Sequence, residues 1–190
     1  LACQKFPDLT KADQLLIPEL AKFGIQAKAI IWDDPSVEWT SFDYLIFRNT
    51  WDYYEKESAF NLWLDKLENL GVKTLNALDT IRANKHKFYL RTLEKQGIKI
   101  LPTIFIEKTN HLDLTQMLPK SWKKAVIKPA FSAGSYLTEV FEADNLAATN
   151  KKYQPIAAVK DLLLQQFMPE IQSLGETSLV FFNKQFSHAI

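Results

Sequence analysis

The sequence predicts an α/β protein in which an open α/β unit is followed by an α+β unit. Three of the five glycines, Gly24, Gly71 and Gly97, each follow an amphipathic stretch and precede a β-branched residue. This pattern is typical of a helix that ends in a left-handed glycine and leads directly into a strand, so helices and strands alternate in the first half. Beyond Gly97 the predicted strands are joined by short connections, which favours antiparallel pairs.

The first unit is expected to hold a parallel sheet covered by helices. The helix that ends at Gly71 carries apolar residues at positions i, i+3, i+4 and i+7, which form one buried face. These residues are Phe60, Trp63, Leu64 and Leu67. The strands are predicted at residues 26–32, 44–47 and 72–75. The middle strand is almost wholly apolar, as a parallel strand buried on both faces should be.

The second unit begins with a long helix, expected from Asp79 as its N-cap to about Gln96. A short helix is expected at residues 112–118. The strands are expected at residues 102–106, 125–128, 136–141, 162–167, 177–182 and 185–190, the last two as a hairpin. Because the pattern of predicted helices and strands changes near residues 76–79, we divide the chain into two domains, 1–77 and 78–190.

Composition and charge exclude several classes of protein. The chain has 190 residues, with 23 Lys and Arg against 22 Asp and Glu, and this balance argues against a binder of nucleic acid. No apolar run approaches the roughly 20 residues of a membrane span, and no signal peptide is recognisable. The single cysteine, Cys3, has no partner for an intrachain disulfide, so we expect a cytoplasmic protein. Because the chain starts with Leu1 and ends at Ile190 inside a predicted strand, we expect both ends to be cut.

The common catalytic and nucleotide-binding motifs are absent. The sequence contains no GxGxxG, GxxxxGK, HExxH, CxxC or GxSxG pattern. Its three histidines, His86, His111 and His188, are far apart and lack the spacing of metal ligands. We therefore predict no metal site built from histidine and cysteine.

The segment 125–135 is the most informative one. Lys128 interrupts an apolar strand, and small residues follow it in a turn. Small residues let backbone N–H groups approach an anion, and a lysine on the strand adds a positive charge beside it, which suits a phosphate. Val126 shares a face with Lys128 and offers an apolar surface for a flat ring. The alternative is an ordinary hairpin whose lysine points to water.

A second lysine strengthens the phosphate interpretation. At about 100° per residue, Lys85 falls in the middle of the apolar stripe of the long helix that begins near Asp79, whereas His86 and Lys87 fall outside it and should face solvent. A lysine within an apolar stripe either extends its stem to water or is neutralised by a buried anion.

A third feature is the apolar strand that ends in two amides, Gln165 and Gln166, before Pro169. Exposed backbone at such a crossing can bond to the edge of a purine, and Glu176 in the next segment could accept from ribose hydroxyls or hold a cation. Alternatively, the two glutamines are ordinary polar residues at a strand end and Glu176 is solvated.

The order of these features resembles the ATP-grasp superfamily, in the branch that contains D-cycloserine ligase and glutathione-synthetase-like proteins. The resemblance rests on residues 48–53, on Ile127-Lys128-Pro129 with the small residues 132–134, and on Gly175 to Phe182 with Phe186 to Ala189. It implies that residues 1–77 form a pre-ATP-grasp domain on the substrate side. Residues 78–190 would then form an ATP-grasp domain, with its first lobe and the start of its second, truncated at the C-terminus.

The resemblance also implies a role for each candidate ATP-binding residue. Lys85 and Lys128 would contact the phosphates, and the loop formed by Ser132, Ala133, Gly134 and Ser135 would cover them. Gln165 would face the adenine amino group, Val126 would wall the adenine slot, and Glu176 would hold the ribose. Backbone bonds to the adenine would come from Gln166, Phe167 and Met168.

The implied activity is an ATP-dependent ligase that activates a small-molecule carboxylate as an acyl phosphate for attack by an amine or a similar nucleophile. The implied cofactors are ATP and Mg²⁺. In such enzymes the Mg²⁺ ligands lie downstream of the segment that ends here at Ile190, so we expect the 190 residues alone to bind a nucleotide without efficient catalysis. The alternatives are a regulatory or degenerate nucleotide-binding module, or an interaction protein that binds no nucleotide.

The acceptor site is expected after the buried strand at 44–47, because ligands of open α/β sheets gather at the ends of such strands. Arg48 could pair with a substrate carboxylate, and the aromatic rings that follow could wall the site. The alternative is a domain-packing motif with Arg48 in a structural ion pair. The candidate substrate residues are Arg48, Thr50, Trp51, Asp52 and Tyr53.

Overall fold

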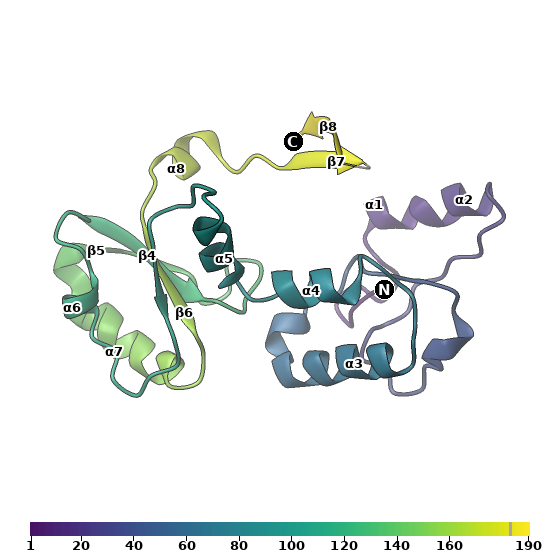
Figure 1. Cartoon of the computed structure of the whole chain (residues 1–190), viewed down its shortest axis with the longest axis horizontal. Coiled ribbons are helices and arrows are strands. Elements are labelled where there is room, and N and C mark those ends of the chain that lie inside the picture. Colours follow the sequence, from purple (N-terminus) through teal and green to yellow (C-terminus); the bar gives the residue numbers. More distant parts are fainter. Residues whose placement is uncertain (183) are drawn as a thin grey trace.

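The computed structural model describes residues 1–182 and 184–190. The chain forms two units that lie side by side (Figure 1). The elements of the first unit are α1 (Lys11–Gln14), α2 (Leu16–Ala21), η1 (Trp39–Ser41), β1 (Leu45–Ile46), η2 (Tyr53–Glu55), α3 (Glu57–Asn69), β2 (Thr74–Leu75) and α4 (Leu78–Asn84). The elements that follow are α5 (Tyr89–Lys95), β3 (Thr103–Ile106), α6 (Leu114–Met117), β4 (Lys124–Pro129), β5 (Glu139–Glu142), η3 (Ala143–Asn145), α7 (Leu146–Ala157), β6 (Leu162–Gln166), α8 (Glu170–Leu174), β7 (Leu179–Phe182) and β8 (Gln185–Ala189).

The first unit is an α/β layer with a small parallel sheet. β1 and β2 pair in parallel, and Ala2 forms a parallel bridge to Ile31. The predicted strand at 26–32 is wrong in extent, because only the bridge of Ile31 to Ala2 is formed there. α3 buries all four residues of its predicted apolar face. The mixed α/β character of this unit is confirmed, and the predicted junction of helix and strand is formed at Gly71, between α3 and β2.

The core of the first unit is rich in aromatic rings. Trp32, Trp39 and Trp63 are each at least nine-tenths buried, and Trp63 packs against both of the other tryptophans with ring centroids about 5.5 Å apart. Phe131 enters this cluster from the second unit. Rings of this size supply most of the buried apolar area of a small domain, so these contacts hold the first unit together.

The predicted single helix from Asp79 to Gln96 is wrong, because the chain forms two helices, α4 and α5, separated by residues 85–88. Asp79 lies in the first turn of α4, and the N-cap is Ala77. α4 stays on the first unit, where Arg82 pairs with Asp65 and Glu68 of α3 at 2.7 and 3.1 Å. The backbone N–H of Lys87 instead donates to the carbonyl of Ala130 in the second unit at 2.8 Å. The predicted helix is interrupted where the chain passes from contacts with the first unit to contacts with the second.

This packing bears on the domain boundary. Leu78 and Ile81 of α4 pack against the core of the first unit. The boundary at residue 77 remains a prediction, and the packing favours grouping α4 with the first unit.

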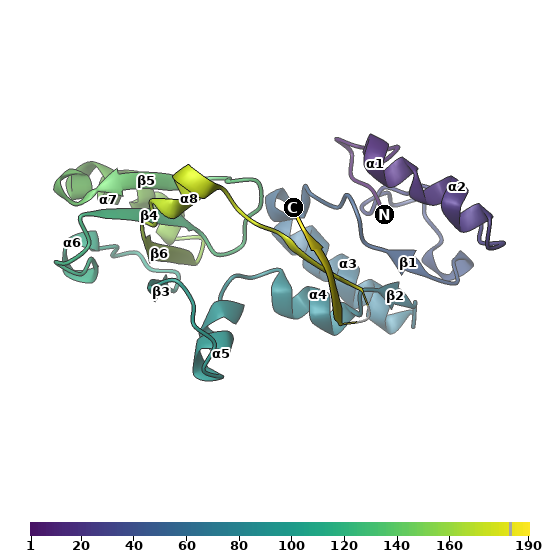
Figure 2. The same cartoon turned by 90° about the horizontal axis from the view of Figure 1, so that it is seen from above.

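The second unit is an antiparallel sheet in the order β3-β6-β4-β5. Helices α6 and α7 cover one face, seen from above in Figure 2. Ala125 and Ile127 of β4 are fully buried on that face, whereas Val126 and Lys128 share the opposite face, as predicted. The prediction did not include α7. β7 and β8 form the expected hairpin as a separate two-stranded sheet, preceded by the short helix α8. None of the helices described is long and apolar enough to cross a membrane.

Candidate functional site

The candidate site lies on the sheet face opposite α7. The strand register pairs Val126 of β4 with Gln165 of β6 and Lys128 with Leu163, so these four residues share this face. Gln165 is buried, and its side-chain amide donates to the Thr103 hydroxyl of β3 at 2.9 Å. The face therefore combines an apolar floor with one lysine and one ordered amide.

Two lysines approach each other at one end of this face. Burial lowers the pKa of Lys128, although the nearby Glu176 carboxylate acts in the opposite direction. Burial and the charge of Lys128 together lower the pKa of Lys87 to about 8. Lys87 Nζ donates to the Ser132 hydroxyl at 3.0 Å and also to the Ser132 carbonyl oxygen. Two cations from different elements thus lie beside the small-residue loop, which is the arrangement that an anion would stabilise.

Lys85, the other lysine predicted to contact phosphate, does not lie beside Lys128. Its ammonium donates to the Asn61 side chain of α3, within the first unit. Burial lowers the pKa of Lys85, and the nearby Arg82 adds to this effect. The role of Lys85 in phosphate binding remains a prediction without support from this geometry, and Lys87 occupies the expected place.

His86 and Lys87 correct a further expectation, because both were predicted to face solvent. His86 is half-buried, and its Nε2 lies 3.2 Å from Asp161 Oδ2 in the second unit. The helix phase used for the prediction does not continue through residues 85–88. No glycine or proline marks this break in the sequence, so no local signal identified Lys87.

The small-residue loop contains a run of left-handed backbone. Gly134, Ser135 and Leu137 have φ values of +55°, +59° and +49°. Such conformations in residues other than glycine concentrate at ligand clamps. The buried Ser132 hydroxyl donates to the Pro129 carbonyl at 2.8 Å, which fixes the start of the loop. Ala133 begins a turn closed by the Tyr136 N–H, which donates to the Ala133 carbonyl at 3.0 Å.

The predicted adenine hinge follows β6. The Gln166 N–H donates to the Pro102 carbonyl at 3.1 Å, and the Phe167 N–H donates to the Lys124 carbonyl at 3.2 Å. Met168 N–H has no acceptor among the residues that the structure describes. Of the three predicted hinge residues, Gln166 and Phe167 therefore have their N–H groups bonded within the described part of the chain, and Met168 does not. Glu176 is exposed in the segment after α8.

Arg48 forms the structural ion pair that was the alternative to substrate binding. Its Nε donates to Asp13 Oδ1 at 2.7 Å, and the buried Asn49 amide donates to Asp13 Oδ2 at the same distance. The Arg48 side chain is nevertheless half-exposed. A guanidinium has five N–H donors, so the pair with Asp13 leaves donors for a second carboxylate.

The Asp13 cluster leads to a pH-dependent prediction. Burial acts to raise the pKa of Asp13, but hydrogen bonds from Arg48, Asn49 and Thr10 outweigh it and hold the pKa below its ordinary value of 3.8. A depressed carboxyl pKa stabilises the fold above the unfolded-state pKa, and this stability is lost as the pH falls through the folded-state pKa. We expect Asp13→Asn to lower the free energy of unfolding by about 2 kcal/mol at pH 7. Urea denaturation of both proteins at pH 7 and pH 3 should show the difference shrinking at the lower pH. A difference that is equal at both pH values would contradict this account.

The other candidate substrate residues are mostly engaged in packing. Asp52 accepts from the Trp32 indole at 2.7 Å and from Lys56 Nζ at 3.1 Å. Thr50 is buried, Tyr53 packs on Phe131, and only Trp51 is about half-exposed. These residues therefore follow β1 directly, and most of them are held by contacts with neighbouring side chains.

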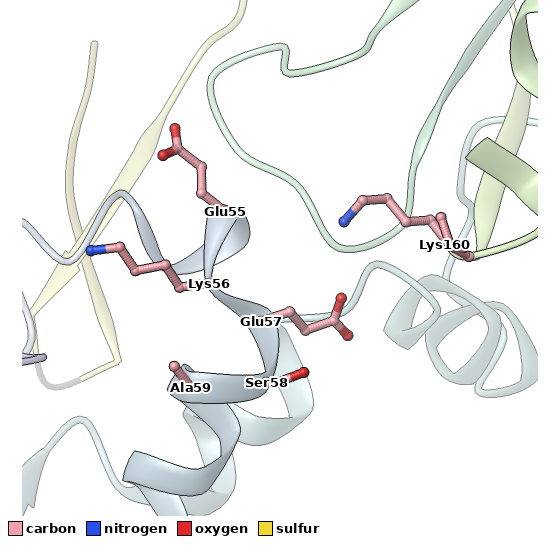
Figure 3. Close-up of a pocket in the computed structure, with 7 residues that line it drawn as sticks. Glu55, Lys56, Glu57, Ser58, Ala59 and Lys160 are labelled. Carbon is pink, nitrogen blue, oxygen red and sulfur yellow. The ribbon is translucent and has the colours of Figure 1, made fainter. Parts of the chain in front are cut away.

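A shallow cavity of about 360 Å³ lies near this segment and was not predicted. It is lined by residues 55–59 at the start of α3 and by Val159 and Lys160 before β6. In Figure 3 the Lys160 side chain points toward the segment that carries Glu55 and Glu57. None of the predicted ATP-binding or substrate residues lines it. Among residues 1–182 and 184–190, no group of three or more His, Cys, Asp or Glu side chains is placed to hold a metal ion.

Comparisons with known proteins agree with the fold. Residues 1–76 match the family model of the N-terminal domain of D-cycloserine synthetase DcsG. The chain is 25% identical over 175 residues to the cycloserine biosynthesis protein DcsG of Streptomyces lavendulae, covering 88% of this chain and 57% of that protein. The crystal structure of D-cycloserine synthetase DcsG superposes with a TM-score of 0.84 at 22% identity, covering 94% of this chain and 62% of that one.

Two further solved structures share the fold at greater distance. One is a RimK domain protein of the ATP-grasp type from Sphaerobacter thermophilus DSM 20745, with a TM-score of 0.60 at 17% identity over 86% of this chain and 62% of that one. The other is the ATP-grasp ligase PsnB in complex with a phosphomimetic variant of its minimal precursor, Mg and ADP, with a TM-score of 0.53 at 13% identity over 84% and 62% of the two chains. The chain spans less than two thirds of the length of these relatives. These likenesses show that the chain shares the fold of these ATP-grasp proteins, and that residues 1–76 resemble the N-terminal domain of D-cycloserine synthetase DcsG.

Proposed function

We propose that the face formed by β4 and β6 binds ATP. The observation that carries this proposal is that Lys87 Nζ bonds to Ser132 at the start of the loop and lies close enough to Lys128 for the two charges to interact. Burial lowers the pKa of both lysines. A bound phosphate would offset the repulsion between their two positive charges. The adjoining face offers Val126 and Gln165 to a flat ring.

The other predicted residues, apart from Lys85, each have a place in this proposal. Met168 N–H bonds to the adenine edge, and the residues before it, Gln166 and Phe167, hold the hinge. Glu176 binds the ribose hydroxyls, since a carboxylate accepts from two such donors. The loop of residues 132–135 covers the phosphates, where its left-handed backbone lets N–H groups converge on an anion.

We further propose that the whole protein is an ATP-dependent ligase. ATP supplies a γ-phosphoryl group: the carboxylate oxygen of one substrate bonds to the γ-phosphorus, ADP leaves, and an acyl phosphate remains. An amine or a similar nucleophile then bonds to the acyl carbon, and inorganic phosphate leaves. Lys87 and Lys128 act by stabilising the negative charge that is redistributed during phosphoryl transfer.

Among residues 1–182 and 184–190, no three His, Cys, Asp or Glu side chains are grouped so as to hold a metal ion. PsnB was solved with Mg and ADP, and we propose that this protein also uses Mg²⁺, with ligands in the part of its longer relatives that the 190 residues do not span. On this proposal the 190 residues bind a nucleotide without efficient turnover. A regulatory module that binds a nucleotide without catalysis would share this behaviour, and ligase assays on a chain extended beyond Ile190 would separate the two.

The substrate side is proposed at residues 48–53. The half-exposed Arg48 would bind a small-molecule carboxylate with the donors that Asp13 leaves free. The exposed Trp51 ring, which packs edge-on against Phe6 at 5.4 Å, would form a wall.

Thermal unfolding with a non-hydrolysable ATP analogue tests the proposed nucleotide site. An analogue such as AMPPNP at 100 times its dissociation constant should stabilise the protein by about 2.7 kcal/mol, because it binds the folded state only. The expected result is a melting temperature that rises with AMPPNP concentration. Adenosine, which lacks phosphates, is the matched control and should give a much smaller shift. A melting temperature unaffected by saturating AMPPNP would favour an interaction protein that binds no nucleotide.

A further inference from the structure

The small-residue loop of the second unit is held by aromatic rings of the first unit. The Phe131 ring lies 5.3 Å from the Tyr53 ring at an angle of 76°, and the Tyr136 ring lies 5.0 Å from the Tyr54 ring at 44°. Phe131 is only 3% exposed and belongs to the core cluster of the first unit, although it follows strand β4 of the second unit. Both ends of the loop therefore contact one short segment, η2.

The same loop carries groups that bond to Lys87. Ser132, which follows Phe131 directly, receives hydrogen bonds from Lys87 Nζ through its hydroxyl and carbonyl oxygens. The Ala130 carbonyl accepts from the Lys87 backbone N–H at 2.8 Å. An anion that drew Lys87 away from Ser132 would break the contacts of Ser132, and Ser132 is the neighbour of Phe131 in the chain.

Tyr136 sits between two residues with left-handed backbone, Ser135 and Leu137. Bulky residues adopt this conformation only where their surroundings impose it. Two contacts restrain this part of the loop: the packing of Tyr136 on Tyr54, and the Tyr153 hydroxyl, which donates to the Leu137 carbonyl at 2.8 Å. A rearrangement of the loop over a ligand would therefore displace the Tyr136 ring and the ring of Tyr54 that it contacts.

We propose that the pairs Phe131–Tyr53 and Tyr136–Tyr54 couple the nucleotide site to residues 50–55 of the first unit, so that ordering of the loop by a nucleotide also orders that segment. The inference rests on the proposed nucleotide site. Tyr54 and Tyr136 are positioning residues, since they act through the loop. Coupling between two binding sites is reciprocal, so a ligand on residues 48–53 would in turn favour the ordered loop.

Hydrogen–deuterium exchange with and without AMPPNP tests the coupling in the intact chain. In the unmodified protein, AMPPNP should slow exchange in peptides that cover the loop, residues 129–138, and also in peptides that cover residues 50–56. In Tyr136→Ala, which leaves the Phe131–Tyr53 pair in place, the protection of the loop should remain while that of residues 50–56 is reduced. Tyr54→Ala removes the other ring of the same contact and should give the same pattern. Agreement of the two variants would show that the effect does not come from misfolding of one of them.

Two matched variants serve as controls. Tyr136→Phe keeps the ring and should keep the coupling. Tyr44→Ala removes an exposed tyrosine of the first unit that packs beneath Lys73 rather than on the loop, and it should leave both regions protected.

The outcomes distinguish a failure of the proposed coupling from a failure of the proposed nucleotide site. Protection of the loop without protection of residues 50–56 in the unmodified protein would overturn the coupling and leave the nucleotide site intact. Undiminished protection of residues 50–56 in both alanine variants would overturn the role of the Tyr136–Tyr54 pair. Absence of protection everywhere, together with no thermal shift, would overturn the nucleotide site and the coupling with it.

Discussion

Lys128→Met is expected to weaken the binding of AMPPNP by a factor of about 30 or more, which corresponds to roughly 2 kcal/mol for the loss of one partner from a buried pair of charges. The ammonium lies on the face that also carries Val126 and Gln165, where burial strengthens its attraction for a phosphate. Methionine preserves most of the apolar stem, so the loss would report the charge. Isothermal titration calorimetry at fixed ionic strength measures the effect.

In the absence of ligand, the free energy of unfolding of Lys128→Met should be at least that of the unmodified protein. Lys128 forms no salt bridge or hydrogen bond with the residues that the structure describes, and burial disfavours its charge. A matched control is Lys152→Met. Lys152 pairs with Glu139 and lies on α7, which covers the opposite face of the sheet. It should leave AMPPNP affinity unchanged. Equal affinities of Lys128→Met and the unmodified protein would remove Lys128 from the proposed site.

The features that could be predicted from the sequence are those set by local periodicity. Val126 and Lys128 share a face because side chains alternate along any strand, whatever surrounds it. The apolar face of α3 is equally local, since Phe60 and its partners repeat with the helix period. For the same reason the predicted hairpin at the C-terminal end, now β7 and β8, is confirmed.

The features that could not be predicted depend on packing between the two units. The break between α4 and α5 has no local signal, because it arises where Arg82 stays with α3 while Lys87 bonds to the second unit. The helix phase was carried through that break, so Lys85 was chosen in place of Lys87. α7 was missed for a different reason: the face that it buries consists of Thr149, Tyr153 and Ala157, which give a weak apolar pattern.

The interpretation of Arg48 shows a third limit. The sequence left open a substrate site and a structural ion pair, because the partner, Asp13, lies 35 residues earlier in the chain. The structure supplies the ion pair and also leaves the guanidinium half-exposed. These two roles are compatible, so the substrate role of Arg48 remains a prediction that depends on identifying the carboxylate.

Lys87→Met should weaken AMPPNP binding by more than tenfold, whereas Lys85→Met should leave the affinity almost unchanged. A charge-assisted bond to a phosphate contributes about 1.5–3 kcal/mol, and only Lys87 lies beside Lys128 and the Ser132 loop. Lys85→Met should instead reduce stability, because it removes the bond to Asn61 of α3. Parallel calorimetric titration and urea denaturation of the two variants measure both effects. The reverse order of affinities would restore Lys85 to the site in place of Lys87.

The pH dependence of nucleotide binding gives Lys87 a signature of its own. Its pKa of about 8 means that the ammonium is charged at pH 7 and largely neutral at pH 9, so AMPPNP affinity should fall as the pH rises between these values. Lys87→Arg, which stays charged, should bind with little change over the same range.

Stability without ligand should change with pH in the opposite direction. Between pH 8 and the ordinary lysine value of 10.5, the unfolded chain retains a proton that the folded chain has lost, so the Lys87 contribution to the free energy of unfolding rises with pH. Comparison with Lys87→Met at each pH isolates this contribution from those of other groups. If affinity and stability rose together across this range, the depressed pKa of Lys87 would not be the cause, and the convergence of two cations on the Ser132 loop would lose its main electrostatic support.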